Sequence, residues 1–230
     1  MYQTSDTTTP SRHKERASWD DHVVDSILDE AIIGHLAFVD DGRPQVLPML
    51  FVRVGTSVYL HGSTGAHFAR LAKGGRRLPV SFEVTLIDGL VLARSAFSHS
   101  ANYRCVVAHG EAVLVPEEAR KEAVLAALMD KLVPGRNDEA RSPRPDELRK
   151  TALLELPLTD VAAKVRSGSP LDDEADLGLD VWAGVRPIVA HWGTPIDSDD
   201  LAEGVRLPSY LSGQTCGSGL LRAGSEAVTA

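Results

Sequence analysis

Residues 33–60 read IGHLAFVDDGRPQVLPMLFVRVGTSVYL, and the turns in this stretch decide the fold class. Asp41-Gly42 separates the apolar run Ile33–Val39 from the next run, Pro44–Val54, and an Asp-Gly pair between two such runs is the strongest short signal of a hairpin. A second turn at Gly55-Thr56 leads into the apolar residues 58–60. The stretch therefore predicts three consecutive antiparallel strands.

The remainder of the chain adds more strands than helices. Apolar runs predict strands over residues 78–87, 90–93, 102–115, 151–158 and 181–185, and helical spacing predicts helices over 18–30, 66–73, 116–132 and 146–150. We interpret Asp88-Gly89 as a turn and the segment that carries Lys164 and Arg166 as a loop. Because the strands follow one another in hairpin order rather than alternating with helices, we predict an α+β fold, mainly β, built on a small antiparallel barrel.

The domain organisation follows from shifts in composition. Residues 1–17 are polar and rich in Ser and Thr, and we expect a disordered N-terminal tail there. Residues 18–195 hold the apolar periodicity of one folded domain. Residues 196–230 become polar and rich in Gly and Ser, so we expect a flexible C-terminal extension.

The composition of the chain argues against several classes of function. A net charge of −8 argues against nucleic acid or an anionic membrane surface as the main partner, although one basic pocket still allows a phosphorylated small molecule. The two cysteines, Cys105 and Cys216, lie far apart, and neither they nor the histidines show metal-ligand spacing, so we expect no disulfide framework and no metal site. The polar N-terminus is unlike a secretory signal and no apolar run reaches membrane-spanning length, so we expect a cytoplasmic protein.

One corner of the predicted fold has the composition of an anion site. A strand end at residues 58–60 is followed by the small polar residues 61–65 and then by a helical pattern with His67, Arg70 and Lys73 on one side. Loop amides, hydroxyls and cations attract phosphate. An ordinary strand-to-helix turn capped by Ser63 or Thr64 explains the same residues, and spacing alone leaves both readings open.

Several phrases, all in the same order, make the chain similar to a known family. These are DDG-P-V-PM from residue 40, YLHG-S from 59, DGLVLARSAF-HS-NYR from 88, AKVRSG-P from 163 and VWAGV-P from 181. Together they resemble the pyridoxamine 5′-phosphate oxidase-like flavoproteins, and more closely the FMN-binding split-barrel branch that includes nitroimidazole reductases. The likeness covers residues 18–192.

The resemblance implies a six-stranded antiparallel split β-barrel with flanking helices. It also implies a homodimer that binds FMN in a groove between the subunits. On the strand whose backbone lines the flavin ring in relatives, this chain has Val46, Leu47, Pro48 and Met49. The segment that reaches the ribityl chain and phosphate corresponds to His61, Gly62 and Ser63.

One phosphate position departs from the family pattern. Relatives commonly carry Arg or Lys where this chain has His67. Arg70 or Lys73 could supply the missing positive charge.

Two further elements are implied to lie near the flavin. Asn102, Tyr103 and Arg104 match an Asn-Tyr-Arg element expected close to the cofactor, although neighbouring residues of a strand point to opposite faces. Trp182 corresponds to a Trp that packs against the flavin in pyridoxamine phosphate oxidases. A core or dimer-interface role explains Trp182 equally well.

The leading hypothesis is an FMN-dependent oxidoreductase that acts on a small, electron-poor aromatic molecule. A bound flavin would supply the redox chemistry, which agrees with the lack of any Ser/His/Asp or Cys/His constellation in the sequence. The alternatives are a non-enzymatic flavin or haem carrier and a deazaflavin-dependent reductase. True pyridoxamine phosphate oxidase activity is disfavoured, because no Arg-rich substrate-phosphate motif follows Trp182.

Overall fold

The structure, a computed structural model, describes residues 2–211. Its helices are α1 (Asp21–Glu30), α2 (His67–Leu71), α3 (Glu118–Leu132) and α4 (Pro145–Lys150). Its strands are β1 (Ala17–Ser18), β2 (Ile33–Asp40), β3 (Arg43–Val54), β4 (Ser57–Ser63), β5 (Leu78–Leu92), β6 (Ser100–Leu114), β7 (Thr151–Pro157), β8 (Asp160–Arg166) and β9 (Gly184–Pro187). Short 3-10 helices include η3 (Arg136–Asp138) and η5 (Ser209–Leu211).

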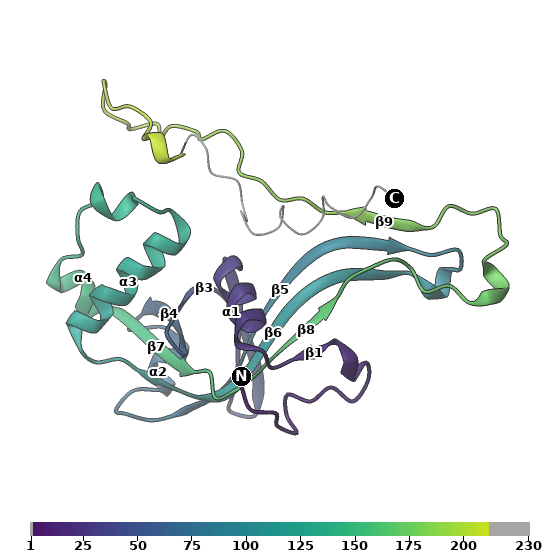
Figure 1. Cartoon of the computed structure of the whole chain (residues 1–230). Coiled ribbons are helices and arrows are strands. Elements are labelled where there is room, and N and C mark those ends of the chain that lie inside the picture. The colour runs from purple at the N-terminus through teal and green to yellow at the C-terminus, as the bar shows by residue number, and fades with distance from the viewer. Residues whose placement is uncertain (1, 212–230) are drawn as a thin grey trace.

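Six of the strands close into a ring. The order β6-β7-β4-β3-β2-β5 returns to β6, and every pairing is antiparallel. β6 pairs with β7 only at Val113 and Leu114, whereas its residues 103–109 pair with β8 outside the ring. This change of partner splits the barrel and leaves β5 and β6 as a long curved ribbon (Figure 1). The prediction of a mainly β, six-stranded antiparallel split barrel with flanking helices is confirmed.

The β2–β3 hairpin forms as its sequence predicts. Asp41 and Gly42 have φ angles of 46° and 71°, the left-handed conformation of a two-residue turn that matches strand twist. Gly42 adopts this conformation without steric cost, and Asp is among the residues that tolerate it. The turn therefore fixes the register in which Asp40 faces Arg43.

Strands extend further than their local sequence indicates. The predicted turn at Asp88-Gly89 is wrong, because β5 continues through it with a register shift between Ile87 and Gly89, as in a β-bulge. The predicted loop around Lys164 and Arg166 is also wrong. That segment is β8, whose backbone groups pair with β6 on one side and with β1 on the other.

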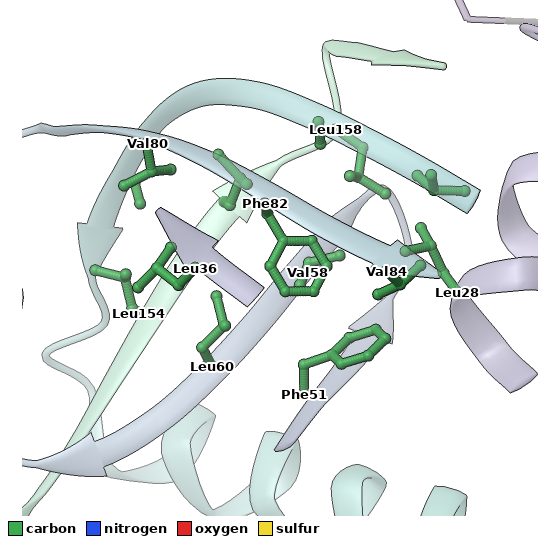
Figure 2. Close-up of a cluster of buried hydrophobic side chains, with 14 of the residues drawn as sticks. Leu28, Leu36, Phe51, Val58, Leu60, Val80, Phe82, Val84, Leu154 and Leu158 are labelled. Atoms are coloured by element: carbon green, nitrogen blue, oxygen red, sulfur yellow. The ribbon is translucent and has the colours of Figure 1, made fainter. Parts of the chain in front are cut away.

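The barrel interior is an apolar core. Figure 2 shows the side chains from β2, β3, β4, β5 and β7 that meet there. The rings of Phe51 and Phe82 pack edge to face with centroids 5.0 Å apart. Gly34 on β2 makes room for them, because an added Cβ would lie 2.2 Å from Phe82 Cζ. A smaller cluster lies under α3 and contains Val52, Tyr59, Val115, Val124, Leu128 and Leu153.

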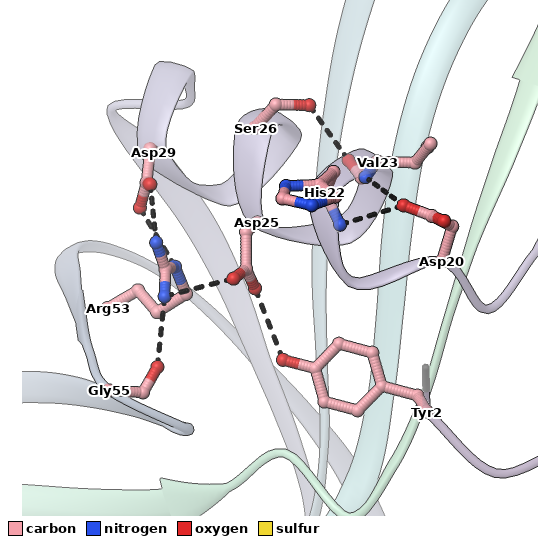
Figure 3. Close-up of polar contacts among 9 residues, drawn as sticks. All are labelled: Tyr2, Asp20, His22, Val23, Asp25, Ser26, Asp29, Arg53 and Gly55. Atoms are coloured by element: carbon pink, nitrogen blue, oxygen red, sulfur yellow. Dashed lines mark hydrogen bonds and ion pairs between the residues drawn. The ribbon is translucent and has the colours of Figure 1, made fainter.

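Helix α1 is held at both its start and its side (Figure 3). The Asp20 carboxylate accepts hydrogen bonds from the backbone N–H groups of His22 and Val23, which is the expected N-cap. Arg53 of β3 donates to Asp29 and lies 3.2 Å from Asp25. These contacts fix α1 across one mouth of the barrel.

The N-terminal residues lie against the barrel. The Tyr2 hydroxyl donates to Asp25, Ser5 and Thr7 donate to Asp160, and β1 pairs with β8. The segment for which we predicted a disordered tail is therefore bonded to α1 and β8 in this structure.

The C-terminal arm, residues 167–211, runs away from the barrel and returns. It pairs with β5 through β9 and then crosses to the α3 side of the molecule (Figure 1). There the Tyr210 hydroxyl donates to Glu139, 2.7 Å away. The arm includes the first part of the extension predicted from residue 196, and the rest of that prediction, residues 212–230, lies outside the described residues.

Candidate functional site

β3 presents apolar side chains on the outside of the barrel. Val46 is 60% exposed and Pro48 is exposed as well, whereas Leu47 and Met49 pack against the core. This alternation follows from the period of two along a strand. Of the four residues predicted to line a flavin, only Val46 and Pro48 therefore have side chains that a ligand on this face would touch.

His61 and Ser63 of β4 alternate with the buried Leu60, so their side chains point to the outer face of the barrel, where His61 pairs with Leu153 of β7. His61 Nδ1 is buried, and neither ring nitrogen has a hydrogen-bond partner among residues 2–211. Burial lowers the pKa of His61, so its ring is neutral at pH 7. A buried N–H without an acceptor is rarer than a buried lone pair, so we assign the proton to Nε2.

The residues after β4 form a corner that is already cross-linked. Arg70 Nη1 donates to the Gly65 carbonyl at 2.6 Å, and Arg70 Nη2 lies 2.9 Å from His67 Nδ1. His67 Nε2 lies 2.6 Å from the Asp40 carboxylate at the tip of the β2–β3 hairpin. Since a carboxylate only accepts, His67 donates from Nε2 to Asp40 and accepts from Arg70 at Nδ1.

The corner is less cationic than its sequence indicates. Asp40 places a negative charge beside His67, and Arg70, next to His67, is a cation that can meet an anion. Ser63 Oγ accepts from the Gly65 N–H at 3.1 Å, which leaves its own O–H to donate outward. Gly62 is required here because an added Cβ would lie 2.9 Å from Phe68 Cζ.

The Asn-Tyr-Arg element lies on β6, in the part of the long ribbon that pairs with β8. Asn102 is buried, donates to the Gly168 carbonyl and accepts from Arg166, so it holds the loop after β8. Tyr103 is half-buried on the opposite strand face. The structure therefore uses Asn102 and its partner Arg166, which the sequence reasoning left in a loop, to build the frame.

Arg104 is bound on both sides by carboxylates. It makes two hydrogen bonds to Glu30 of α1 and two to Asp88 at the β5 bulge, over 2.5–3.0 Å. These charge-assisted bonds raise the pKa of Arg104 above its usual value. With four of its five N–H groups engaged, Arg104 has little left for a cofactor within one chain.

Trp182 stands apart from the corner. It precedes β9 on the C-terminal arm, is 67% exposed and folds over Gly184, where an added Cβ would lie 2.7 Å from its ring. Figure 1 places β9 and α2 at different ends of the molecule. One chain therefore brings His61, Ser63, His67 and Arg70 together and leaves Trp182 far from them.

A cavity of about 400 Å³ opens between β2, β5 and the start of the arm. Its lining is Glu30, Ala31, Ile32, Ile33, His35, Thr85, Leu86, Ile87, Asp88, Arg104, Ile188 and Ala190. The sequence analysis gave His35 no role, because the histidines show no metal-ligand spacing. Within residues 2–211 there is no cluster of three or more His, Cys, Asp or Glu side chains placed to hold a metal ion. None of the helices described is both long and apolar enough to span a membrane.

Comparisons with known proteins cover most of the chain. A family model described as pyridoxamine 5′-phosphate oxidase matches residues 20–165. No curated protein matches the chain at a significant level.

Two solved structures match nearly the whole chain. The flavocytochrome Anf3 from Azotobacter vinelandii is 34% identical, with a TM-score of 0.84 over 90% of this chain and 96% of that one. The FAD and heme binding protein from Mycobacterium smegmatis is 34% identical, with a TM-score of 0.81 over 87% of this chain and 98% of that one.

A third structure bears on the fold alone. A candidate 5-nitroimidazole antibiotic resistance protein from Bacteroides thetaiotaomicron is 19% identical, with a TM-score of 0.52 over 65% of this chain and 86% of that one.

Proposed function

The chain belongs to the pyridoxamine 5′-phosphate oxidase family, and from that premise we propose that it is a flavin-dependent oxidoreductase. The flavin lies on the outward face of β3 and β4. Membership confirms the family resemblance, and flavin binding is common to the relatives. The catalytic role and the flavin type are our proposals.

The observation that carries the proposal is an exposed apolar strip on β3 together with an unpartnered His61 on the next strand, β4. Val46 and Pro48 offer a surface for one face of an aromatic ring system, and backbone groups of β3 border it. His61 Nε2–H offers a neutral donor on the next strand, β4. Ser63 and Arg70 follow at the corner, where a phosphate would take their hydrogen bonds.

When bound, a flavin supplies the electron transfer itself. The protein's residues then have to bind, orient and exclude water. Val46 and Pro48 support the ring, His61 donates to it without carrying charge, and Arg70 neutralises phosphate. None of these side chains has to act as an acid or base in the proposed reaction.

For the flavin type we favour FAD over the FMN implied by the sequence resemblance. The terminal phosphate of FMN is a monoester that carries nearly two charges near pH 7, whereas each phosphate of FAD carries one. The corner sets the cation Arg70 close to the anion Asp40, which suits the lower charge on each single phosphate of FAD. The 34% identical relative from Mycobacterium smegmatis is named for FAD.

We further propose that a second copy of this chain completes the site. The strip is open in one chain, and Trp182 lies too far along the ribbon to reach it. A two-fold dimer would bring Trp182 of one copy to the strip of the other. The homodimer predicted from the sequence is thus part of the proposed function. The small-molecule substrate and the cytoplasmic location predicted from the sequence are also part of it.

The test is the visible spectrum of the purified full-length protein. We expect flavin absorbance near 450 nm, and release of a flavin whose fluorescence rises on phosphodiesterase treatment, as FAD does and FMN does not. Bleaching by a reductant and reoxidation by an acceptor distinguish an oxidoreductase from a carrier. A colourless protein that binds neither flavin contradicts the proposal.

The corner has its own test. Replacing Ser63 and Arg70 together with Ala should weaken flavin binding by about 2–4 kcal/mol, roughly one to two for each charge-assisted contact. Arg77→Ala is the matched control, because that exposed cation pairs with Glu111 instead. Unchanged flavin content in the double variant would remove the corner from the site.

A second candidate function, haem binding in addition to flavin, is favoured by one observation. The 400 Å³ cavity is mostly apolar and contains a histidine, His35, that is held by a carboxylate. The two 34% identical relatives are named as a flavocytochrome and as an FAD and heme binding protein. We therefore propose that this chain binds haem as well.

A further inference from the structure

His35 is held in one orientation by its neighbour across the sheet. It faces Glu83 in the pairing of β2 with β5, and its Nδ1 lies 3.2 Å from Glu83 Oε2. The other oxygen of Glu83 accepts from Thr85, so the carboxylate is itself fixed. Because a carboxylate only accepts, the proton is on Nδ1, and neutral His35 carries its lone pair on Nε2.

The lone pair of His35 is available on the cavity side. His35 lines the 400 Å³ cavity, and because Glu83 occupies Nδ1, Nε2 is the ring nitrogen left for a ligand. A histidine whose Nδ1–H donates to a carboxylate is the usual arrangement of a metal-bound imidazole, since the carboxylate fixes the tautomer and raises ligand basicity.

The cavity suits a flat apolar ligand. Seven of its lining residues are Ala, Ile or Leu, from the segment around Ala31, from β5 and from the arm. The arm residue Ile188 closes one side, and its N–H donates to the Asp88 carbonyl at 3.0 Å. Arg104 is the cation in the lining and is already paired with Glu30 and Asp88, so acidic groups of a ligand would have to face solvent.

We propose that His35 is the axial ligand of a haem iron bound in this cavity, through Nε2 and with Glu83 as its positioning residue. This inference rests on the haem binding proposed above. Iron held by a histidine in an apolar pocket is a standard haem arrangement. The volume lies within the range of small-molecule and cofactor sites.

The other half-buried histidines fit this role less well. His61 lacks an acceptor for Nδ1–H, which a neutral metal-bound imidazole requires. His67 uses both ring nitrogens, for Asp40 and Arg70. His109 bonds to Ser81 and lines a different, smaller cavity of about 180 Å³.

The experiment is a haemin titration of the full-length protein, read from the Soret band and the spectrum of the reduced complex. We expect one haem per chain with a histidine-ligated spectrum. His35→Ala should lose that spectrum and regain it when imidazole is added. His35→Met should bind haem with a shifted spectrum. Glu83→Gln should weaken haem binding by about 10–100-fold, as loss of a metal ligand's hydrogen-bond partner does.

His109→Ala is the matched control, since it removes a histidine from the same sheet face but from outside the cavity. His61→Ala tests the alternative ligand. A wild-type spectrum in His35→Ala, or loss of the spectrum in His61→Ala alone, would overturn the assignment. Failure of the wild type to bind haemin would also overturn it. Flavin absorbance in the same samples reports separately on the flavin proposal, which stands if flavin binds and haem does not.

Discussion

Lys131 shows how one residue links pH to stability. Its ammonium donates to the carbonyls of Leu28 and Phe51 and lies 3.6 Å from the centre of the Phe51 ring, so it pins α3 to α1 and β3. Burial lowers the pKa of Lys131 from 10.5 to about 8. Between these pH values the unfolded chain keeps the proton and the folded chain has lost it.

We therefore predict that the free energy of unfolding rises with pH through this group. The gain is up to about 1.4 kcal/mol per pH unit between pH 8 and 10.5. Lys131→Met removes the titrating group and should remove the gain. Urea unfolding of both proteins at several pH values measures it, and a difference between them that stays constant from pH 8 to 10 would contradict the prediction.

At the residue scale, the sequence predicts the face on which a side chain lies better than it predicts the residues that the side chain contacts. Alternation along a strand already separates Val46 and Pro48 from Leu47 and Met49. The role of Arg104 depends on Glu30, 74 positions away, and on Asp88 at a bulge. No local pattern encodes such contacts. Arg104, which the sequence resemblance places near the cofactor, therefore holds α1 and β5 together within one chain.

At the element scale, packing overrides local signals. In isolation, the Asp88-Gly89 pair would form a hairpin turn. In the structure, β6 pairs with β5 on both sides of the pair, and the extra residue is accommodated as a bulge. The β8 segment has weak strand propensity and forms because β6 needs a partner where it leaves β7. The hairpin at Asp41-Gly42, by contrast, forms where its local turn sequence predicts it.

Strand β2 gives a prediction at this scale. Gly34→Ala should destabilise the fold by about 1–3 kcal/mol, because the new methyl group would overlap the buried Phe82 ring and approach Phe51 Cδ1 to 3.2 Å. Thermal or urea unfolding measures the loss. Gly178→Ala, at a position with nothing within 4 Å of the new Cβ, is the control and should be near neutral. Equal stability of the two variants would contradict the packing argument.

At the scale of the whole molecule, the outside of the barrel lacks a cover. Ile33, Val39 and Val46 are 43–64% exposed on the outward face of the β2–β3 hairpin. The described C-terminal arm adds Trp182, Trp192 and ten exposed aliphatic side chains. We expect this much exposed apolar surface to form an interface, and a symmetric dimer covers the same residues on both copies.

A substitution at Val39 tests dimerisation without changing a residue that contacts the flavin. It is 64% exposed and is not one of the residues placed at the flavin. In a monomer, Val39→Lys would change stability by less than about 0.5 kcal/mol. In a dimer, it removes about 1.5 kcal/mol of apolar burial per copy and sets two charges in the interface, so association should weaken by at least roughly tenfold.

We predict that Val39→Lys shifts the protein from dimer to monomer and lowers its flavin content in proportion, because each site needs both copies. Light scattering across a dilution series measures mass, and absorbance near 450 nm in the same fractions measures flavin. Val54→Lys, at the far end of β3, is the control and should stay dimeric. A monomeric Val39→Lys variant that keeps its flavin would show that one chain holds the cofactor alone, and it would refute the shared site.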